Sequence, residues 1–364
     1  MEKYAVLQSS SHLKMVWIER KIMSMTNSPF LCNLLYAFES ERELFLVMPF
    51  MQGGDLRFHL KERGTMPVAT CQFYAAEMIL GLMAMHEKKV VFRDLKPDNM
   101  LLDAQGHLRI SDFGLACILE ERHSWQTTGQ AGTRGYQSPE VITDQWYGCE
   151  ADIWSAGVTI YELLHGVRPW KDWTKLQAAL KDDNKQEKEK EKEKEKEKEV
   201  SDEHEGKERD RARDARQIHV SSKLDAVTAD FLQRILCVDI KKRLGCGPRG
   251  WEEVRSHAWF ATIDWDKISR KEVTPPITPD LSRANCTADA DLADQLLDRK
   301  PRPIPVEQQQ HFKGWKFRTE IQKKNSENIV VKPASATHEE SAQTVPVSQQ
   351  NDVASTASVK PSAN

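Results

Sequence analysis

The sequence of 364 residues has no long apolar run, no close pair of cysteines and little net charge. Without a run of about 18 apolar residues, we expect no membrane span. The seven cysteines are dispersed, with no CxxC pair, which argues against a disulfide framework or zinc site and favours reduced thiols in the cytoplasm. A formal charge of −3 implies no general attraction to nucleic acid. The first residues, MEKYAVLQSS, lack the layout of a signal peptide.

The residues that are present suffice for a sizeable core, since 39% are hydrophobic and they include 10 Trp and 12 Phe. Apolar residues recur at helical spacing in three segments, which predicts helices at 16–23, 71–86 and 152–166. Two short runs between the first two, LLYAFES and ELFLVMPF, are typical of strands. MLLDAQGHLRISDFG predicts a small hairpin around its Asp-Ala-Gln-Gly turn. Helical spacing returns at 224–245.

Composition changes abruptly at residues 181–216, where Glu and Lys alternate and almost nothing is apolar. Such a segment buries too little surface to offset its chain entropy, so a solvated, disordered insertion is predicted. Like charges at i,i+4 and opposite charges at i,i+3 roughly cancel, which leaves a mobile linker, a frayed helix or a charged docking arm open. Residues 269–330 are rich in proline and include the aromatic island HFKGWKF, and the Ser/Thr-rich residues 331–364 are predicted to be disordered.

The segment VVFRDLKPDN places three chemically useful side chains within six residues of one another: Asp94, Lys96 and Asn99. Phosphoryl transfer needs a positioned hydroxyl, metal ions on the phosphates and cations facing the developing charge. Asp94 could orient a hydroxyl and accept its proton, and Lys96 could face the transferred phosphate. Asn99 and Asp112, the latter in SDFG, could bind Mg²⁺ through their oxygen atoms.

These motifs, in this order, resemble the protein kinase signature set: RDLKPDN, then DFG, then SPE at 138–140. The Lys within the first motif resembles the serine/threonine type. MQGGDLRFHL, AGTRGYQSPEV and IYELLHGVRPW look like the AGC group of kinases. GGDLRFHL, together with ANCTADADLADQLLDRKPRP, is most similar to the YANK branch, with the G-protein-coupled-receptor kinases nearby.

The resemblance implies an α+β, two-lobe protein kinase fold that transfers the γ-phosphoryl group of ATP to protein Ser/Thr hydroxyls. The chain would act as a monomer on protein substrates, with ATP and Mg²⁺, and without nucleic acid or a membrane span. A small-molecule kinase is disfavoured because GTRGYQSPE is similar to a platform for peptides. The expected divisions are a partial N-lobe (1–51), the C-lobe (52–180 and 217–268), the charged insertion (181–216), an AGC-type tail (269–330) and the final tail (331–364).

The resemblance also assigns site residues. Glu19 matches the helix glutamate that pairs with the ATP-binding lysine, and Thr133 matches the residue that bridges Asp94 and Lys96. The remaining assignments concern the nucleotide pocket and comprise the gatekeeper Met48, the hinge residues Pro49 and Met51, the ribose-binding Asp55, the pocket floor Leu101, and Ser111. Two further sets follow, the stacked apolar positions Met23, Leu34, Phe92 and Phe113, and the buried ion pair Glu140–Arg243.

The glycine-rich loop and the ATP-binding lysine of the family have no match, because no GxGxxG occurs and the lysine position precedes Met1. Lys3 is too close to Glu19 to substitute. The sequence is therefore expected to start inside the small lobe, either through an incomplete gene model or as a truncated product. Strands without their neighbours would leave an open sheet edge. A catalytically inactive interaction or scaffold protein is the alternative function.

Two regulatory features differ from the family, and one further feature concerns the substrate. The usual activation-loop phosphosite falls on Gly129, so activity should need no phosphate there or should use Thr128, although Arg93 remains as a receptor for one. The aromatic motif HFKGWKF resembles the tail segment that AGC kinases press against the small lobe, and both a docked and an undocked tail are open. Asp55 and Asp98 lie where AGC enzymes read basic residues, which suggests basic-directed substrates.

Overall fold

Short runs of β-type residues build a small antiparallel sheet near the N-terminus. β1 (Tyr36–Glu39) and β2 (Leu44–Val47) pair with Tyr36 opposite Val47. The charged turn between them closes with a hydrogen bond from the Ser40 N–H to the Glu43 carbonyl (2.9 Å). A third strand, β8 (Phe317–Arg318), comes from the far end of the chain and pairs with the other edge of β1, so the sheet order is β2-β1-β8.

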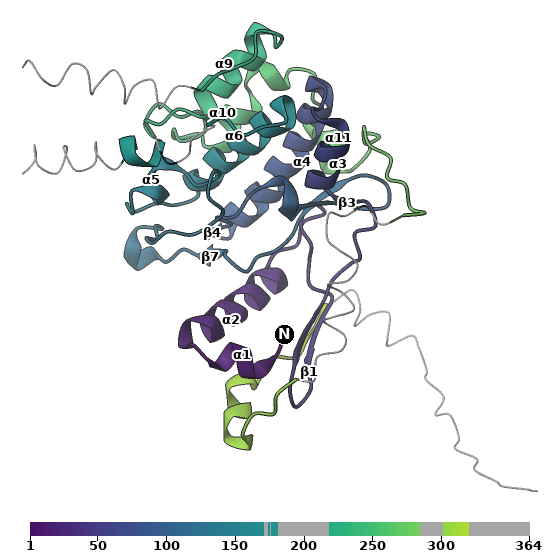
Figure 1. Cartoon of the computed structure of the whole chain (residues 1–364), viewed down its shortest axis with the longest axis vertical. Helices are drawn as coiled ribbons and strands as arrows, with labels where there is room; N and C mark the ends of the chain where they lie inside the picture. Colours follow the sequence, from purple (N-terminus) through teal and green to yellow (C-terminus); the bar gives the residue numbers. More distant parts are fainter. Residues whose placement is uncertain (171–173, 175, 181–217, 284, 286–300, 320–364) are drawn as a thin grey trace, which may run out of the picture. The chain divides into compact units, whose positions relative to one another are not determined.

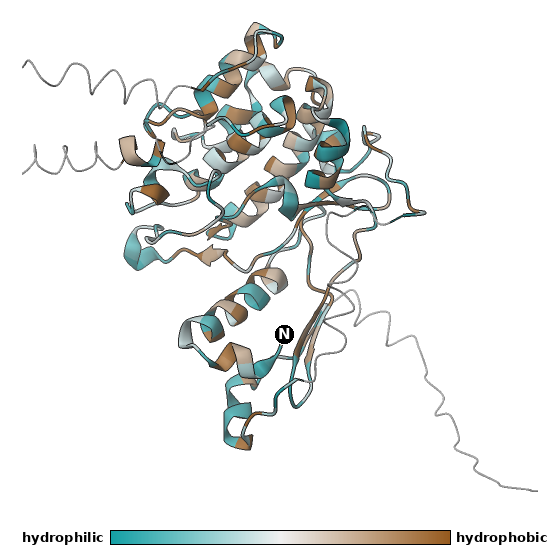
Figure 2. Cartoon of the chain, viewed as in Figure 1, coloured by the Kyte–Doolittle hydropathy of each residue, from teal (hydrophilic) through white to brown (hydrophobic). Residues whose placement is uncertain are grey.

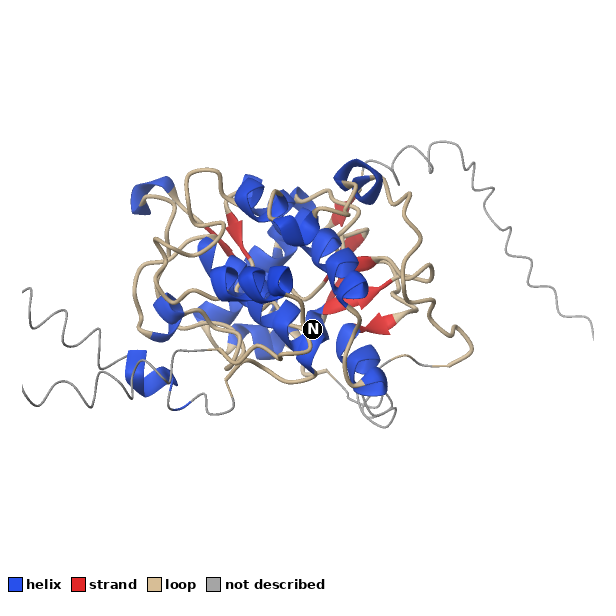
Figure 3. Ribbon diagram, turned by 90° about the horizontal axis from the view of Figure 1, so that it is seen from above, coloured by secondary structure: helices blue, strands red, loops and turns tan. Residues whose placement is uncertain are grey.

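The computed structural model describes residues 1–170, 174, 176–180, 218–283, 285 and 301–319. The chain divides into two units, Met1–Lys323 and Lys324–Asn364, and every described residue belongs to the first. The predictions for 181–216 and 331–364 lie outside the described residues. Figure 3 shows the described strands as small groups among helices and loops.

The other elements whose bounds are described in the first unit are helices, short 3₁₀ turns and short strands. In chain order, the helices and 3₁₀ turns are α1 (Lys3–Leu7), α2 (Ser10–Met25), α3 (Leu56–Arg63), α4 (Val68–Glu87), η1 (Pro97–Asn99), η2 (Glu121–His123), α5 (Pro139–Ile142), α6 (Glu150–His165), α9 (Ala226–Ile235), α10 (Trp251–Arg255), η3 (Ala258–Phe260), α11 (Trp265–Ser269) and η4 (Val306–Phe312). The strands are β3 (Gly54–Asp55), β4 (Val90–Val91), β5 (Met100–Leu102), β6 (Leu108–Ile110) and β7 (Cys117–Ile118).

Two groups of elements form the first unit (Figure 1). The smaller contains α1, α2 and the β2-β1-β8 sheet, and the larger is mostly helical, with α4 packed on α6, β6 and α11. Main-chain hydrogen bonds join the two groups, from the Cys32 N–H to the Ile110 carbonyl (2.9 Å) and from the Ile110 N–H to the Phe30 carbonyl (2.8 Å). The predicted α+β, two-lobe kinase fold is confirmed.

The expectation that the sequence holds nothing long and apolar enough to cross a membrane needs correction at α4. This helix is long and apolar enough by length and composition, but most of it is buried inside the protein. Most of its residues are pale to brown in Figure 2, whereas α3 is mostly hydrophilic. Burial against α6 and β6 accounts for the apolar composition, as in the core helix of a globular domain.

The predicted hairpin at residues 100–114 is confirmed. β5 and β6 pair antiparallel, with Met100 opposite Ile110 and Leu102 opposite Leu108. The Asp103 carboxylate accepts hydrogen bonds from the N–H groups of Gln105 (3.1 Å) and His107 (2.9 Å), which closes the turn as an Asx turn does. The hairpin carries the DFG segment directly after β6.

The expected open edge of the small sheet is largely covered. Beside β2, the Leu44 N–H and carbonyl bond to the carbonyl (2.8 Å) and amino group (2.8 Å) of Met1. On the other side, β8 covers β1, and its neighbours Phe312 and Trp315 are fully buried. The aromatic motif HFKGWKF is therefore docked on the small lobe.

Side chains of α2 hold the docked tail. Arg20 donates from Nε to the Trp315 carbonyl (2.7 Å), and Trp17 donates to the His311 carbonyl (3.1 Å). The rings of Trp17 and Trp315 meet edge to face with centroids 5.3 Å apart. An aromatic pair of this kind adds about 1 kcal/mol beyond the buried area, so the tail contributes to the stability of the small lobe.

Candidate active site

A buried carboxylate on α6 shapes the loop that follows β4. Asp152 is fully buried and accepts hydrogen bonds from the N–H groups of Phe92 (2.7 Å) and Arg93 (2.8 Å) and from His86 (2.8 Å). These contacts hold Arg93 at φ +72°, a conformation that costs a non-glycine residue about 1 kcal/mol or more. The loop is thus fixed before its functional side chains begin.

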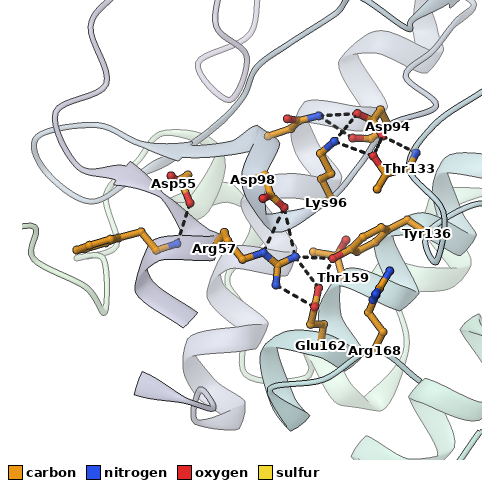
Figure 4. Close-up of polar contacts among 12 residues, drawn as sticks. Asp55, Arg57, Asp94, Lys96, Asp98, Thr133, Tyr136, Thr159, Glu162 and Arg168 are labelled. Atoms are coloured by element: carbon orange, nitrogen blue, oxygen red, sulfur yellow. Dashed lines mark hydrogen bonds and ion pairs between the residues drawn. The ribbon is translucent and has the colours of Figure 1, made fainter. Parts of the chain in front are cut away.

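Four predicted site residues meet in one hydrogen-bonded cluster (Figure 4). Lys96 Nζ bonds Asp94 Oδ2 (2.8 Å) and Thr133 Oγ1 (2.7 Å), and Thr133 donates to Asp94 Oδ1 from its N–H (2.8 Å) and its hydroxyl (2.6 Å). Asn99 donates from Nδ2 to the carbonyl (2.9 Å) and Oδ2 (3.1 Å) of Asp94. The Asp94 carboxylate is therefore held both by its own loop, through Lys96 and Asn99, and by Thr133, which is distant in sequence.

Gly132 lets the activation segment (residues 115–137) approach the catalytic loop (RDLKPDN, residues 93–99). It adopts φ +96°, and a Cβ there would lie 2.2 Å from the Arg93 carbonyl oxygen. Only glycine accommodates both the conformation and the contact. The close approach brings Thr133 within hydrogen-bond distance of Asp94.

The loop that carries DFG is attached to the catalytic loop through Ser111. Its N–H and hydroxyl both donate to the Asn99 carbonyl, at 2.9 and 3.2 Å. Asp112 follows at φ +65° with an exposed side chain, and its Oδ1 accepts from the Gly114 N–H (3.3 Å). The residues predicted to hold a metal, Asn99 and Asp112, thus come from adjoining segments of backbone.

Glu19 on α2 is close enough to Asp112 for the two charges to interact. The pKa of Glu19 is raised to about 7, chiefly by burial and also by the charge of Asp112, while the charge of the amino terminus acts to lower it. Lys3 does not take the role of the family lysine, because its ammonium group bonds Glu39 (2.6 Å) and Gln309 (2.7 Å). Among the described ion pairs, none involves Glu19.

The donor set suits magnesium better than a metal that needs a protein cage. Within the described ranges, no group of three or more His, Cys, Asp or Glu side chains could hold a metal ion. Magnesium is usually bound by one or two protein oxygens together with water and substrate phosphates. Asp112 is exposed, and Asn99 uses its Nδ2 on Asp94, which leaves amide and carboxylate oxygens for such an ion.

The residues predicted to line the nucleotide pocket are placed unevenly. Met51 is buried and Leu101 half-buried, whereas Met48 is 39% exposed. Pro49 is half-buried, between Met48 and the exposed Phe50. Asp55 caps α3 by accepting from the Phe58 N–H (2.7 Å), and burial raises its pKa despite that bond. Asp55 is therefore engaged in holding the helix.

The four predicted apolar stacking positions are all buried, with exposures of 2% or less for Met23, Leu34, Phe92 and Phe113. The rings of Phe92 and Phe113 pack edge to face with centroids 5.8 Å apart. Farther along, Arg243 makes a bidentate ion pair with Glu140 at 2.8 and 2.9 Å, in a site where both are buried. The pair supports the segment that carries Thr133.

Tyr147 ties down the activation segment near Gly129. Its hydroxyl donates to the Gly129 carbonyl (2.9 Å) and accepts from Arg93 Nη1 (3.4 Å), while its backbone pairs with Thr127. Arg93 also donates from Nε to the Leu115 carbonyl (2.6 Å). Sequence reasoning identified Arg93 but missed Tyr147.

Sequence reasoning also missed an arginine beside the catalytic loop. Arg57 on α3 bonds Glu162, Asp98 and the hydroxyl of Tyr136 (Figure 4). Burial disfavours its charge, but the hydrogen bonds and charge of Glu162 outweigh burial and raise the pKa of Arg57. The sequence does contain one signal for this role. A cation in the first turn of a helix is unfavourable because of the helix dipole, so its presence there indicates nearby acidic partners.

Comparison with known proteins agrees with this geometry. The protein kinase domain family matches residues 3–260. The G protein-coupled receptor kinase 2 of Drosophila melanogaster is 36% identical over 273 residues, which cover 73% of this chain and 34% of the relative. The cAMP-dependent protein kinase catalytic subunit PRKX of mouse is 31% identical over 72% of this chain and 64% of the relative.

The ribosomal protein S6 kinase 2 alpha of chicken is 32% identical over 82% of this chain and 36% of the relative. The chain thus spans between about a third and two thirds of the length of these three relatives. It belongs to the protein kinase family and is similar to AGC-type serine/threonine kinases.

Proposed function

We propose that the protein transfers the γ-phosphoryl group of ATP to serine or threonine hydroxyls of other proteins. The observation that supports this most directly is the cluster of Asp94, Lys96, Thr133 and Asn99, in which a carboxylate and an ammonium group are 2.8 Å apart and jointly held. Phosphoryl transfer demands mainly positioning and charge stabilisation, and this cluster supplies both. The alternative of an inactive scaffold is not favoured by the family match.

Each residue of the cluster has a proposed part in the reaction. Asp94 orients the substrate hydroxyl and accepts its proton as the oxygen bonds to the γ-phosphorus. The bond from the γ-phosphorus to the bridging oxygen breaks, and ADP leaves with that oxygen. Lys96 faces the negative charge of the transferred group, while Thr133 fixes the orientation of Asp94 and Lys96.

Nucleotide binding is assigned to the residues between the lobes. Asp112 and Asn99 would hold Mg²⁺, which neutralises phosphate charge when bound. Met48, Pro49, Met51 and Leu101 would contact the adenine, with Pro49 retaining its carbonyl acceptor. Asp55 would bond the ribose, and Ser111 and Glu19 would support the phosphate end.

The finer assignments are also proposals. Residues 1–51 would belong to the N-lobe, 52–180 and 217–268 to the C-lobe, and 269–330 to an AGC-type tail. Placement in the YANK branch depends on GGDLRFHL and on residues 284–303, most of which lie outside the described part of the chain. We propose that the protein acts as a monomer. We also propose a location in the cytoplasm, because the six described cysteines are free thiols.

Transfer of the radiolabelled γ-phosphoryl group of ATP, with Mg²⁺, to a generic protein substrate tests the proposal. Label should enter Ser and Thr, and Asp94→Asn should lower the rate by about 10² to 10⁴. Asp112→Asn should abolish transfer without unfolding the protein, because asparagine tolerates the left-handed backbone. Asp266→Asn, an exposed change on α11, is the matched control. Undiminished transfer by the Asp94 and Asp112 variants would contradict the proposed roles.

A further inference from the structure

A hollow of about 290 Å³ opens beside Lys96 and Thr133, next to the proposed site of transfer. Its charged lining consists of two acids, Asp98 and Glu162, and three cations, Arg57, Lys96 and Arg168. A substrate segment that presents a hydroxyl to Asp94 would pass this hollow with its neighbouring side chains. The charges that remain uncompensated there therefore decide which side chains it accepts.

One arginine from the chain itself contacts both acids of the hollow, although the Asp98 side chain remains 46% exposed. Arg57 makes a bidentate ion pair with Glu162, at 2.9 and 3.1 Å, and contacts Asp98 Oδ2 from Nε (3.3 Å) and Nη2 (3.2 Å). The Tyr136 hydroxyl accepts from Arg57 and donates to Glu162. Glu162 is 6% exposed at its side chain and Arg57 18%, so water screens this pair weakly.

The position of Arg57 indicates that these contacts hold it in place. It is the second residue of α3, whose first turn should favour acids because the helix N-terminus carries partial positive charge. Three elements supply its partners: η1 carries Asp98, the activation segment carries Tyr136, and α6 carries Glu162. An arginine so held occupies the acids that a basic substrate side chain would need.

Arg168 is the cation that remains for a substrate. Its Nη1 donates to the Arg134 carbonyl (2.8 Å), and its guanidinium lies over the Tyr136 ring, 5.8 Å from the centroid. Within the described residues it has no carboxylate partner, whereas Lys96 is paired with Asp94. Gly135 makes room for it, since a Cβ there would lie 2.2 Å from Nη1.

We propose that this hollow selects substrate segments with an acidic side chain near the acceptor hydroxyl and disfavours basic ones, with Arg57 and Arg168 as the specificity-determining residues. The inference rests on the proposed kinase function and replaces the expectation that Asp55 and Asp98 read basic residues. Asp55 caps α3 and Asp98 contacts Arg57. An incoming ammonium or guanidinium group must therefore compete with Arg57 for Asp98, and the charges of Arg57 and Arg168 repel it. An incoming carboxylate meets Arg168 instead.

Peptide binding tests the inference without requiring turnover. The full chain is titrated into fluorescent peptides in which the acceptor is alanine and one flanking position at a time is Glu, Gln or Arg, and anisotropy is recorded at low salt. The wild type should bind the best acidic peptide at least about fivefold more tightly than its basic counterpart, the size expected of a partly exposed charge contact. Arg168→Gln should reduce the ratio toward one.

Arg57→Gln provides the sharper test, because it releases Asp98 and Glu162. Its preference should shift toward the basic peptides by about tenfold, as two freed carboxylates would attract a cation. Arg63→Gln, on the same helix but bonded only to His59 in the described structure, is the matched control and should leave the ratio unchanged. Arg168 is exposed, so its variant still decides the question if Arg57→Gln fails to fold.

Three results overturn the inference: equal binding of acidic and basic peptides by the wild type, a basic preference, or a ratio unchanged in both variants. Failure of the proposed function gives a different result. Acid-selective binding without phosphoryl transfer refutes the function alone, and efficient transfer to peptides with basic flanks refutes the inference alone.

Discussion

Replacing Arg243 by methionine should destabilise the protein strongly, because the guanidinium compensates a buried carboxylate. Arg243 donates to both oxygens of Glu140 at 2.8 and 2.9 Å, and the two side chains are 0% and 6% exposed. Burial alone would raise the pKa of Glu140, but the charge and hydrogen bonds of Arg243 lower it overall. Methionine keeps most of the volume beside Trp154 while it removes the charge.

The expected magnitudes follow from which group is left without a partner. Arg243→Met leaves a buried carboxylate and should cost about 3 to 5 kcal/mol. Glu140→Gln leaves a guanidinium that still donates to the Cys237 carbonyl (3.0 Å), so its cost should be smaller, about 1.5 to 3 kcal/mol. The double variant should cost less than the sum of the two by about 2 kcal/mol, since neither buried charge then remains.

Urea unfolding of the four proteins at pH 7.5, followed by tryptophan fluorescence, measures this coupling. A coupling below about 0.5 kcal/mol would refute the reasoning. Since the pKa of Glu140 is lowered on folding, its contribution is present above its unfolded value of 4.5 and is lost as the pH falls through the folded pKa. Lys242→Met is the control, because Lys242 is 78% exposed and pairs only at the surface.

Three further predictions concern the small lobe and the activation segment. Without nucleotide or divalent cation, Glu19→Gln should stabilise the protein by about 1 to 3 kcal/mol at pH 8, because the pKa of Glu19 is about 7 when folded against 4.5 otherwise; the gain should shrink as the pH falls from 7 toward 4.5, and an equal gain at pH 8 and pH 5 would argue against it. Tyr147→Phe should cost about 1 kcal/mol and speed proteolysis of residues 115–137, since it loses the bond to the Gly129 carbonyl; unchanged cleavage would show that the hydroxyl does not hold the segment. Trp315→Ala should cost about 3 to 5 kcal/mol and expose residues 301–319 to protease, whereas Val306→Ala, at a side chain 87% exposed, should do neither; an undisturbed tail in the tryptophan variant would contradict its docking.

Features that depend on near neighbours in sequence were predictable. The β5–β6 hairpin follows from an Asx turn between two apolar runs, and the helices near 71–86 and 152–166 follow from apolar periodicity. The motifs RDLKPDN and DFG lie on either side of this hairpin, so the positions of the two candidate loops could also be predicted. Their chemical roles remain proposals, although the structure gathers Asp94, Lys96, Asn99 and Thr133 into one cluster.

Features that depend on distant partners were not predictable from spacing. Arg57 meets Asp98, Tyr136 and Glu162 at separations of 41, 79 and 105 residues, and no local pattern links them. The tail reaches Arg20 across 295 residues. From the neighbouring residues alone, the edge of the β1–β2 sheet was expected to be open. The strand β8, which comes from a much later part of the chain, pairs with β1 and covers that edge.

The helix α4 shows a different limit of prediction from sequence. An apolar stretch of helix length is ambiguous between a membrane span and a protein core, and only the packing partners decide. In this protein α6, β6 and α11 surround it. The search for a long apolar run overlooked this helix, and the packing of α4 in the structure explains why it is apolar.

Calorimetric titration with a non-hydrolysable ATP analogue, with and without Mg²⁺, tests the central claim that residues of the two adjoining loops form one nucleotide–metal site. The wild type should bind the nucleotide more tightly when Mg²⁺ is present, and Asp112→Asn should lose about tenfold or more of that gain while Asp266→Asn retains it. Nucleotide affinity that is absent, or that depends on Mg²⁺ equally in the wild type and in Asp112→Asn, would contradict the account.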